Sequence, residues 1–142
     1  MLEVNGIKNG VVIDHIPAGK GLKVFSLLFS DMEDPMVLLM NVKSNVLGKK
    51  DIIKIENVSS VNLELLGLIS QSITVNYIVN DALTRKVHVK IPETITGGLK
   101  CSNPRCITHS DDYAIPTFKL LSSNGKAEYE CNYCEEITVY RL

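Results

Sequence analysis

The four cysteines of this chain are its most constraining feature, because they occur as two close pairs within the last third. Cys101 and Cys106 are separated by four residues, and Cys131 and Cys134 by two. Two close cysteine pairs on either side of a ribbon-length spacer are typical of a tetrahedral four-thiolate zinc site. We therefore predict one Zn²⁺ bound by these four residues. Its role would be structural, because four thiolates leave no open position for water or substrate.

Disulfides and redox chemistry are the alternatives for the same cysteines. A bridge between Cys131 and Cys134 would close a small, strained ring, and nothing else suggests an oxidising compartment. A redox role for this pair would require a thioredoxin-like context, which is absent. His109 lies three residues after Cys106, at a position from which a histidine can replace a cysteine ligand, but four cysteines already complete the set. We therefore prefer the zinc interpretation.

The charge balance argues against the nucleic-acid binding that a zinc ribbon first suggests. Residues 1–95 carry ten basic and ten acidic groups, and residues 96–142 carry five and six. Nucleic-acid binding usually requires an excess of Lys and Arg. No apolar run is long enough to span a membrane, and the first residues lack the apolar core of a signal peptide. We expect a cytoplasmic protein, in which the thiols stay reduced.

Thr96-Gly97-Gly98 is the predicted boundary between two domains, residues 1–96 and 97–142. The second part is too small to fold on its apolar core alone, and a bound metal would supply the missing stability. It has candidate strands at 113–121, 126–130 and 136–142, and Asn124-Gly125 is a strong hairpin signal. We predict a small all-β, zinc-ribbon-like domain.

The first part alternates between strand and helix periodicity. Leu22, Phe25, Leu28 and Phe29 recur at helical spacing, as do Val61, Leu65, Leu68 and Ile69. Strands are expected at 11–16, 36–42, 51–58, 73–79 and 83–91. This order predicts an α+β, ferredoxin-like βαββαβ fold with one added strand, in which both helices cover one face of an antiparallel sheet.

Strand alternation also predicts which side chains share the helix-free face of that sheet. Asp14, Lys54, Asn76 and Lys86 would lie there, interleaved with the aliphatic residues Val12, Ile52 and Ile78. Cations suit phosphates, a carboxylate suits ribose hydroxyls and aliphatic residues suit a base, so this face is a candidate nucleotide site. The alternative is an ordinary solvated sheet face, where mixed polar residues are common.

No convincing catalytic constellation is present. Ala18-Gly19-Lys20-Gly21 lacks the full phosphate-loop pattern and is interpreted as a loop that starts a helix. Asp14 and His15 are neighbours in one strand, so alternation predicts that they point to opposite faces and form no catalytic pair. A nucleic-acid-binding ribbon and a stand-alone metalloenzyme are two rival functions for the chain.

Taken together, several segments resemble the regulatory chain family of aspartate carbamoyltransferase, at family spacing and over nearly the whole chain. They are residues 10–17 (GVVIDHIP), 48–57 (GKKDIIKIEN), 74–76 (TVN) and the cluster of Cys101, Asn103, Cys106, Cys131, Tyr133, Cys134 and Glu135. The resemblance implies a non-catalytic subunit of pyrimidine biosynthesis. Its first domain would be allosteric and bind ATP, CTP and UTP, and its zinc domain would dock on the catalytic chain.

The resemblance also implies a set of nucleotide-binding residues. The lysine at Lys86 would meet the phosphates, Asp14 the ribose, and Lys54 the base and ribose region. The full set is Val4, Asn5, Gly6, Ile7, Val12, Asp14, His15, Ile52, Lys54, Asn76, Ile78, Leu83 and Lys86. Asn5-Gly6 stands where the family pattern has an acidic residue and alanine, so the resemblance does not rank ATP against CTP.

The implied assembly joins two catalytic trimers through three regulatory dimers, which pair through their N-terminal domains. Nucleotide binding would shift this assembly between low- and high-activity states through a difference in affinity for the two.

Overall fold

We describe the chain from a computed structural model, which covers residues 6–123 and 126–141. The chain divides into two compact units, Met1–Val89 and Lys90–Leu142. This division falls earlier than the boundary predicted at Gly97, because residues 94–96 form a strand that pairs within the second unit. No helix in the described ranges is long and apolar enough to cross a membrane.

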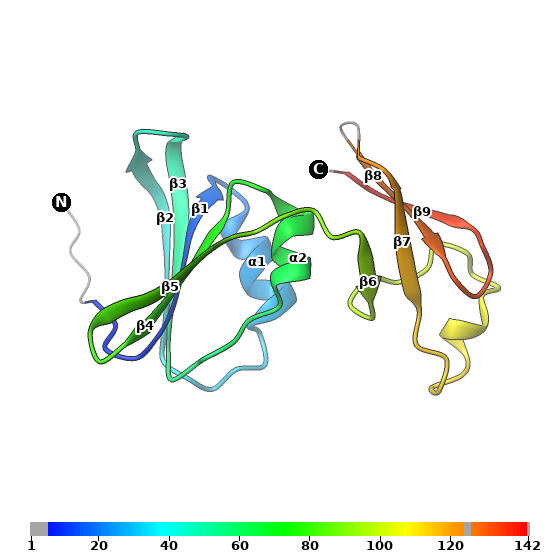
Figure 1. The fold of residues 1–142 in the computed structure, drawn as a ribbon, viewed down its shortest axis with the longest axis horizontal. Helices are drawn as coiled ribbons and strands as arrows, with labels where there is room; N and C mark the ends of the chain where they lie inside the picture. Colours follow the sequence, from blue (N-terminus) through cyan, green and yellow to red (C-terminus); the bar gives the residue numbers. More distant parts are fainter. Residues whose placement is uncertain (1–5, 124–125, 142) are drawn as a thin grey trace. The chain divides into compact units, whose positions relative to one another are not determined.

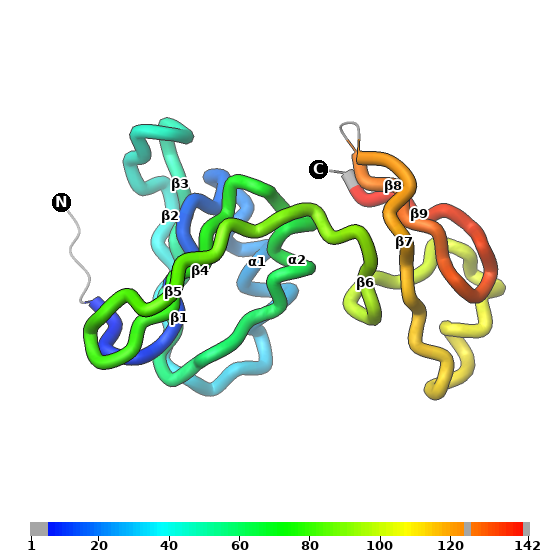
Figure 2. The backbone as a smooth tube through the Cα atoms, viewed as in Figure 1, coloured from blue at the N-terminus to red at the C-terminus, as the bar shows by residue number. Residues whose placement is uncertain are grey.

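The first unit has the predicted α+β order of strand, helix, strand, strand, helix, strand and strand. Its elements are β1 (Gly10–Pro17), α1 (Gly21–Leu28), β2 (Met36–Ser44), β3 (Gly48–Glu56), α2 (Leu63–Ile69), β4 (Thr74–Val79) and β5 (Ala82–His88). The strands form one sheet in the order β2-β3-β1-β4-β5, and every neighbouring pair is antiparallel. β1 is therefore the central strand of the sheet and pairs with both β3 and β4 (Figure 2).

Both helices cover one face of this sheet (Figure 1). Alternate strand residues such as Ile13, Ile53 and Val75 are fully buried, and they pack in one core cluster with Val24 of α1 and Leu66 of α2. The helical residue Leu22, which shares the predicted spacing, is instead 54% exposed. The intervening strand residues consequently point to the helix-free face.

Asp51 on β3 is a fully buried carboxylate that joins three backbone segments. Its Oδ2 accepts hydrogen bonds from the backbone N–H groups of Gly19 (3.1 Å) and Gly21 (2.9 Å), at the start of α1. Its Oδ1 accepts from the N–H of Asn41 (3.0 Å), at an irregularity in β2. A Cβ atom on Gly21 would lie 2.7 Å from Asp51 Oδ2, so glycine is required for this close approach.

The second unit is a four-stranded antiparallel sheet with one short 3₁₀ helix. Its elements are β6 (Thr94–Thr96), η1 (Ile107–His109), β7 (Thr117–Ser122), β8 (Lys126–Cys131) and β9 (Ile137–Arg141), in the sheet order β6-β7-β8-β9. Phe118, Tyr129 and Ile95 are its largest buried side chains. The prediction of strand from residue 113 was wrong, because Asp111 O accepts from Ala114 N in a turn there and the strand begins only after Pro116. The predicted hairpin turn at Asn124-Gly125 lies outside the described residues.

Candidate functional site

The four predicted metal ligands come together in the second unit. Cys101 and Cys106 lie in the loop that leads into η1, Cys131 ends β8, and Cys134 lies in the turn before β9. The four Sγ atoms all lie within 4.8 Å of one another. All four residues are free cysteines, so the disulfide alternative is not supported.

The sulfur positions fit a tetrahedral ion. Zn–S bonds of about 2.3 Å place neighbouring sulfurs about 3.8 Å apart at tetrahedral angles. Sγ of Cys101 lies 3.5 Å from that of Cys134, and Sγ of Cys106 lies 3.8 Å from that of Cys131. Three of the four residues are buried, and Cys134 is half-buried. The cluster can thus hold one thiophilic metal ion that has protein ligands on all sides.

The surroundings shift the pKa values of two thiols of this cluster in opposite directions. The Thr108 hydroxyl donates to Cys106 Sγ at 3.1 Å, and this bond, helped by the Thr108 backbone N–H, lowers the pKa of the Cys106 thiol to about 6. Burial raises the pKa of the Cys101 thiol to about 12. Desolvation opposes a buried anion, so a cation is needed to hold all four groups as thiolates.

His109 supports the cluster without joining it. Its Nε2 lies 2.9 Å from the backbone carbonyl oxygen of Cys101. A carbonyl only accepts hydrogen bonds, so this nitrogen carries the proton and donates. The residue therefore belongs to the surroundings of the four thiols.

On the first unit, the strand register brings the predicted face residues into one row across four strands. Lys54 on β3 is directly opposite Val12 on β1, Val12 is opposite Asn76 on β4, and Asn76 is opposite Lys86 on β5. Directly opposite residues point to the same face, and each strand interval is about 4.8 Å. The two lysines therefore lie about 14 Å apart in backbone position, with a valine and an amide between them.

Two further rows flank this one on the same face. Gly10, Ile78 and Leu83 are opposite one another on β1, β4 and β5. An irregularity between Tyr77 and Ile78 sets Leu83 opposite Ile78, which strict alternation from Lys86 would not do. On the other side, Asp14 is opposite Thr74.

The prediction that Asp14 and His15 point to opposite faces was wrong. A β-bulge lies between Ile13 and Ile16, and His15 adopts a left-handed φ of 57°. Both isoleucines stay in the core, so the two residues between them share the other side. His15 Nδ1 comes within 3.8 Å of Asp14 Oδ2 and within 3.2 Å of Thr74 Oγ1.

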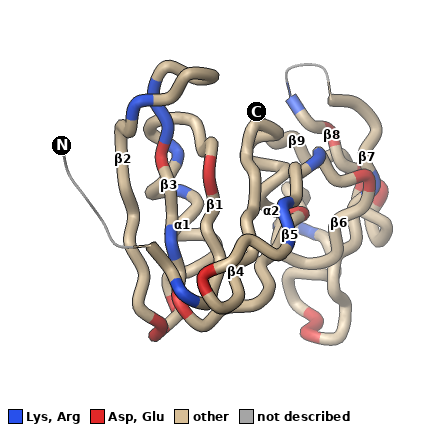
Figure 3. Tube along the Cα trace, turned by 60° about the vertical axis from the view of Figure 1, so that its left-hand side comes forward, with Lys and Arg blue, Asp and Glu red and all other residues tan. Residues whose placement is uncertain are grey.

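Lys50 is a member of this face that sequence reasoning missed. Its Nζ lies 2.9 Å from Asp14 Oδ1, and both side chains are largely buried. The signal was present, because Lys50, Ile52 and Lys54 alternate along β3 and should share a face. Several basic residues lie along the β2–β3 hairpin and β3, with acidic residues among them (Figure 3). Neither Lys54 nor Lys86 has a carboxylate partner among the described residues.

The remaining predicted residues precede β1. Gly6 and Ile7 line a cavity of about 290 Å³ together with Lys54, Glu56 and Val37. Val4 and Asn5 lie outside the described residues. A second cavity of the first unit, about 420 Å³, is lined by Tyr77, Ile78 and Arg85, whose guanidinium lies 5.5 Å from the Tyr77 ring centre.

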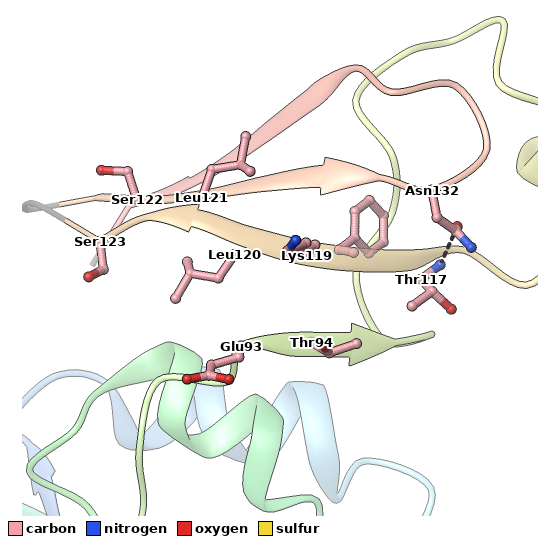
Figure 4. Close-up of a pocket in the computed structure, with 10 residues that line it drawn as sticks. Glu93, Thr94, Thr117, Lys119, Leu120, Leu121, Ser122, Ser123 and Asn132 are labelled. Atoms are coloured by element: carbon pink, nitrogen blue, oxygen red, sulfur yellow. Dashed lines mark hydrogen bonds between the residues drawn. The ribbon is translucent and has the colours of Figure 1, made fainter.

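The second unit has a cavity of about 460 Å³ along β6 and β7 (Figure 4). Glu93, Thr94, Lys119 and Leu120 line it, and the Asn132 side chain accepts from Thr117 N at 3.1 Å at one end. None of its lining residues is a cysteine of the metal cluster. It is therefore separate from the candidate metal centre.

Comparison with known protein families matches both units. Residues 2–90 match the family described as aspartate carbamoyltransferase regulatory chain, allosteric domain. Residues 93–141 match the family described as aspartate carbamoyltransferase regulatory chain, metal binding domain. The second description agrees with the four-cysteine cluster found there.

Several relatives carry the same name over nearly their whole length. Aspartate carbamoyltransferase regulatory chains of Clostridium botulinum and Clostridium acetobutylicum are 47% and 46% identical to this chain, over 96% of it and 94% of each relative. That of Bifidobacterium longum is 39% identical, over 95% of this chain and 97% of the relative. With two matched domains and these relatives, the chain belongs to the family of aspartate carbamoyltransferase regulatory chains, which are non-catalytic subunits that carry an allosteric and a metal-binding domain.

Proposed function

We propose that the chain regulates aspartate carbamoyltransferase by binding the nucleoside triphosphates ATP, CTP and UTP on the helix-free face of its first unit. The observation that carries this proposal is the row Lys54–Val12–Asn76–Lys86. It offers at each end a lysine with no carboxylate partner in the described ranges, and an apolar and an amide side chain lie between the two. An extended nucleotide can lie along this row, with its phosphates at one lysine and its base near the other.

The charges of the face favour one orientation of the bound nucleotide, with its phosphates toward β5 and its base toward β3. Lys86, at the exposed β5 end of the row, receives the phosphates. Asp14 accepts hydrogen bonds from the ribose hydroxyls, and its ion pair with Lys50 holds its carboxylate in place. Lys54 lies beside Gly6 and Ile7 in the 290 Å³ cavity, which is suited to the base. Val4, Asn5, Val12, His15, Ile52, Asn76, Ile78 and Leu83 complete the proposed site.

Binding regulates the enzyme only if the two activity states of the assembly present this face differently. The free-energy difference between the two binding affinities is the most that a nucleotide can contribute to the shift. A ligand that contacts the strands at both ends of the row binds with an affinity that depends on the relative positions of those strands. A change in the spacing of β3 and β5 therefore changes the affinity for the nucleotide.

The metal is Zn²⁺, one ion per chain, bound by Cys101, Cys106, Cys131 and Cys134. Four thiolates at tetrahedral distances favour zinc, and a closed set supports a structural role. The ion shapes the second unit for docking on the catalytic chain. Exposed apolar side chains, including Tyr113 at 95% and Ile115 at 55% exposure, are available there for such a contact.

The chain forms dimers through its first unit, and three dimers join two catalytic trimers in the cytoplasm. β2 supports this arrangement, because it is an edge strand of the sheet. Val37 and Met40 on β2 are exposed apolar residues, as is Val46 in the following turn. Apolar edges of this kind pair readily with another chain.

Calorimetric titration of purified chain with ATP, CTP and UTP tests the nucleotide site directly. We expect Lys86→Ala to weaken triphosphate binding by about 10- to 100-fold, since a hydrogen bond to a charged group contributes about 1.5–3 kcal/mol. Arg85→Ala is the matched control, because Arg85 is the neighbouring cation on β5 and is opposite Tyr77 on the helix side. Equal loss in both variants, or no loss in Lys86→Ala, would refute the assigned role.

Mixing the chain with catalytic trimers tests the partner. We expect a larger complex by ultracentrifugation and an aspartate saturation curve that shifts when nucleotide is added. Nucleic-acid binding without any such complex would favour the ribbon alternative instead.

A further inference from the structure

Thr108 is the second residue of η1, and its hydroxyl donates a hydrogen bond to the sulfur of Cys106. Among the described residues, no other side chain outside the cluster donates to a cysteine sulfur. The Oγ1–Sγ distance to Cys106 is 3.1 Å, which is short for a contact to sulfur. Thr108 is half-buried, and its hydroxyl makes no other side-chain hydrogen bond within the described part of the chain. Its hydroxyl is therefore committed to the thiolate.

A four-thiolate site has an electrostatic need for such a donor. A divalent cation with four thiolates leaves a net charge of about −2 on the cluster. The surroundings bury most of this charge, and a buried anion is costly unless polar groups face it. A hydroxyl that donates to one sulfur spreads part of that charge and holds the sulfur in its ligating position.

The same residue also borders a cavity beside the cluster. A cavity of about 420 Å³ is lined by Thr108, His109, Cys101 and Lys100, together with Gly97 and Gly98. His109 donates to the backbone carbonyl of Cys101 across this wall. Cys101 is the cluster cysteine that belongs to this lining, and Thr108 and His109 contact the two cysteines of the first pair.

We propose that Thr108 is the positioning residue that sets how fast the metal leaves the cluster: its hydroxyl retains Cys106 on the ion, and the adjoining cavity is the path by which competing ligands reach the site. His109 assists by fixing the backbone of Cys101. The inference rests on the zinc proposed above, so metal analysis of the wild-type chain comes first and separates the failure of one from the failure of the other.

The test measures zinc transfer from the full chain to a coloured chelator in excess, at neutral pH. Thr108→Val removes the hydroxyl with little change in shape, and we expect about 10-fold faster transfer or more, in line with changes to residues that support metal ligands. Thr108→Ser restores the hydroxyl and should transfer zinc within about 2–3-fold of wild type. Thr117→Val is the matched control, because Thr117 is also half-buried and its hydroxyl contacts that of Thr96 and no cysteine sulfur among the residues described.

A spectroscopic measurement separates positioning from general loosening of the fold. Co²⁺ in place of zinc gives sulfur-to-metal charge-transfer bands, and these should shift in Thr108→Val but not in Thr117→Val. A Thr108→Val chain that purifies without metal is reloaded with Co²⁺, and its affinity is compared with that of the control. Transfer rates, bands and affinity equal to those of Thr117→Val would overturn the proposal.

Discussion

Replacing Asp51 by asparagine tests whether one buried carboxylate holds three segments of the first unit together. Asparagine has nearly the same shape, but one of the two oxygens becomes an NH₂ group that only donates. Oδ2 accepts from Gly19 and Gly21, and Oδ1 accepts from Asn41. Either orientation of the amide therefore sets a donor against at least one backbone N–H.

The expected cost follows from these contacts. A hydrogen bond to a charged group contributes about 1.5–3 kcal/mol, and a buried donor left without a partner costs about 1–3 kcal/mol. The Asn41 N–H lies at a half-exposed position and the Gly21 N–H at a buried one, so the amide will turn its NH₂ toward Asn41. We expect a loss of about 3 kcal/mol, which lowers the Tm of a unit of this size by roughly 12–24 °C.

Urea unfolding followed by circular dichroism measures this loss in the metal-loaded chain, and amide hydrogen exchange locates it. Exchange should accelerate most at Gly21 and Asn41. Asp31→Asn is the control, because Asp31 is exposed and has no ion pair or side-chain hydrogen bond among the described residues. If Asp51→Asn unfolds within about 0.5 kcal/mol of this control, the proposed role of the carboxylate is wrong.

Three other predictions follow from the same structure. Gly21→Ala should destabilise the first unit by at least about 1–3 kcal/mol in urea unfolding, because its Cβ would lie 2.9 Å from Leu38 Cδ1 and 2.7 Å from the Asp51 carboxylate; an unchanged midpoint would contradict this. Prolonged chelation should unfold the second unit while the first keeps its protection from hydrogen exchange, since the second has a small core of its own; equal loss in both would contradict it. Triphosphate affinity should fall with added salt in wild type and less steeply in the Lys54→Ala, Lys86→Ala double variant, and equal slopes in the two would argue against direct contacts with phosphate.

The order of the elements was predictable because hydrophobic periodicity alternates clearly along residues 10–90. The ends were less so. Strand β6 has only three residues, too few for a periodic signal, and it is defined by pairing with β7. For the same reason, the sequence alone placed the domain boundary after this strand. The glycines at 97 and 98 indicate a turn locally, but the pairing of residues 94–96 with β7 places this strand in the second unit.

The shared face was predictable because alternation needs only local sequence. Alternation alone assigns four residues to one side of the sheet: Lys54, Val12, Asn76 and Lys86. Their alignment in a single row depends on the strand register, which local sequence does not give. Asp51 was not predictable. After Lys49-Lys50 it resembles part of a charged turn, and its burial depends on loops 10 and 30 residues away.

Two of the irregularities in the first sheet, at His15 in β1 and at Asn41 in β2, are stabilised in the same way. Each inserts a residue with a left-handed φ, His15 at 57° and Asn41 at 60°. A bulge removes a backbone N–H from the ladder, and that group then needs another acceptor. In both cases an aspartate supplies it: Asp14 Oδ1 accepts from His15 N at 2.6 Å, and Asp51 Oδ1 accepts from Asn41 N.

This double use of Asp14 determines which substitutions can test the nucleotide site. Its carboxylate fixes the bulge in β1 and also pairs with Lys50, in addition to its proposed contact with ribose. Asp14→Ala would therefore change the backbone of the central strand and release a half-buried lysine, so a loss of nucleotide affinity would not identify a lost contact. Lys86 lies on an exposed edge strand with no ion pair among the described residues. A loss of binding in Lys86→Ala, with the fold unchanged, therefore reports a lost contact with the ligand.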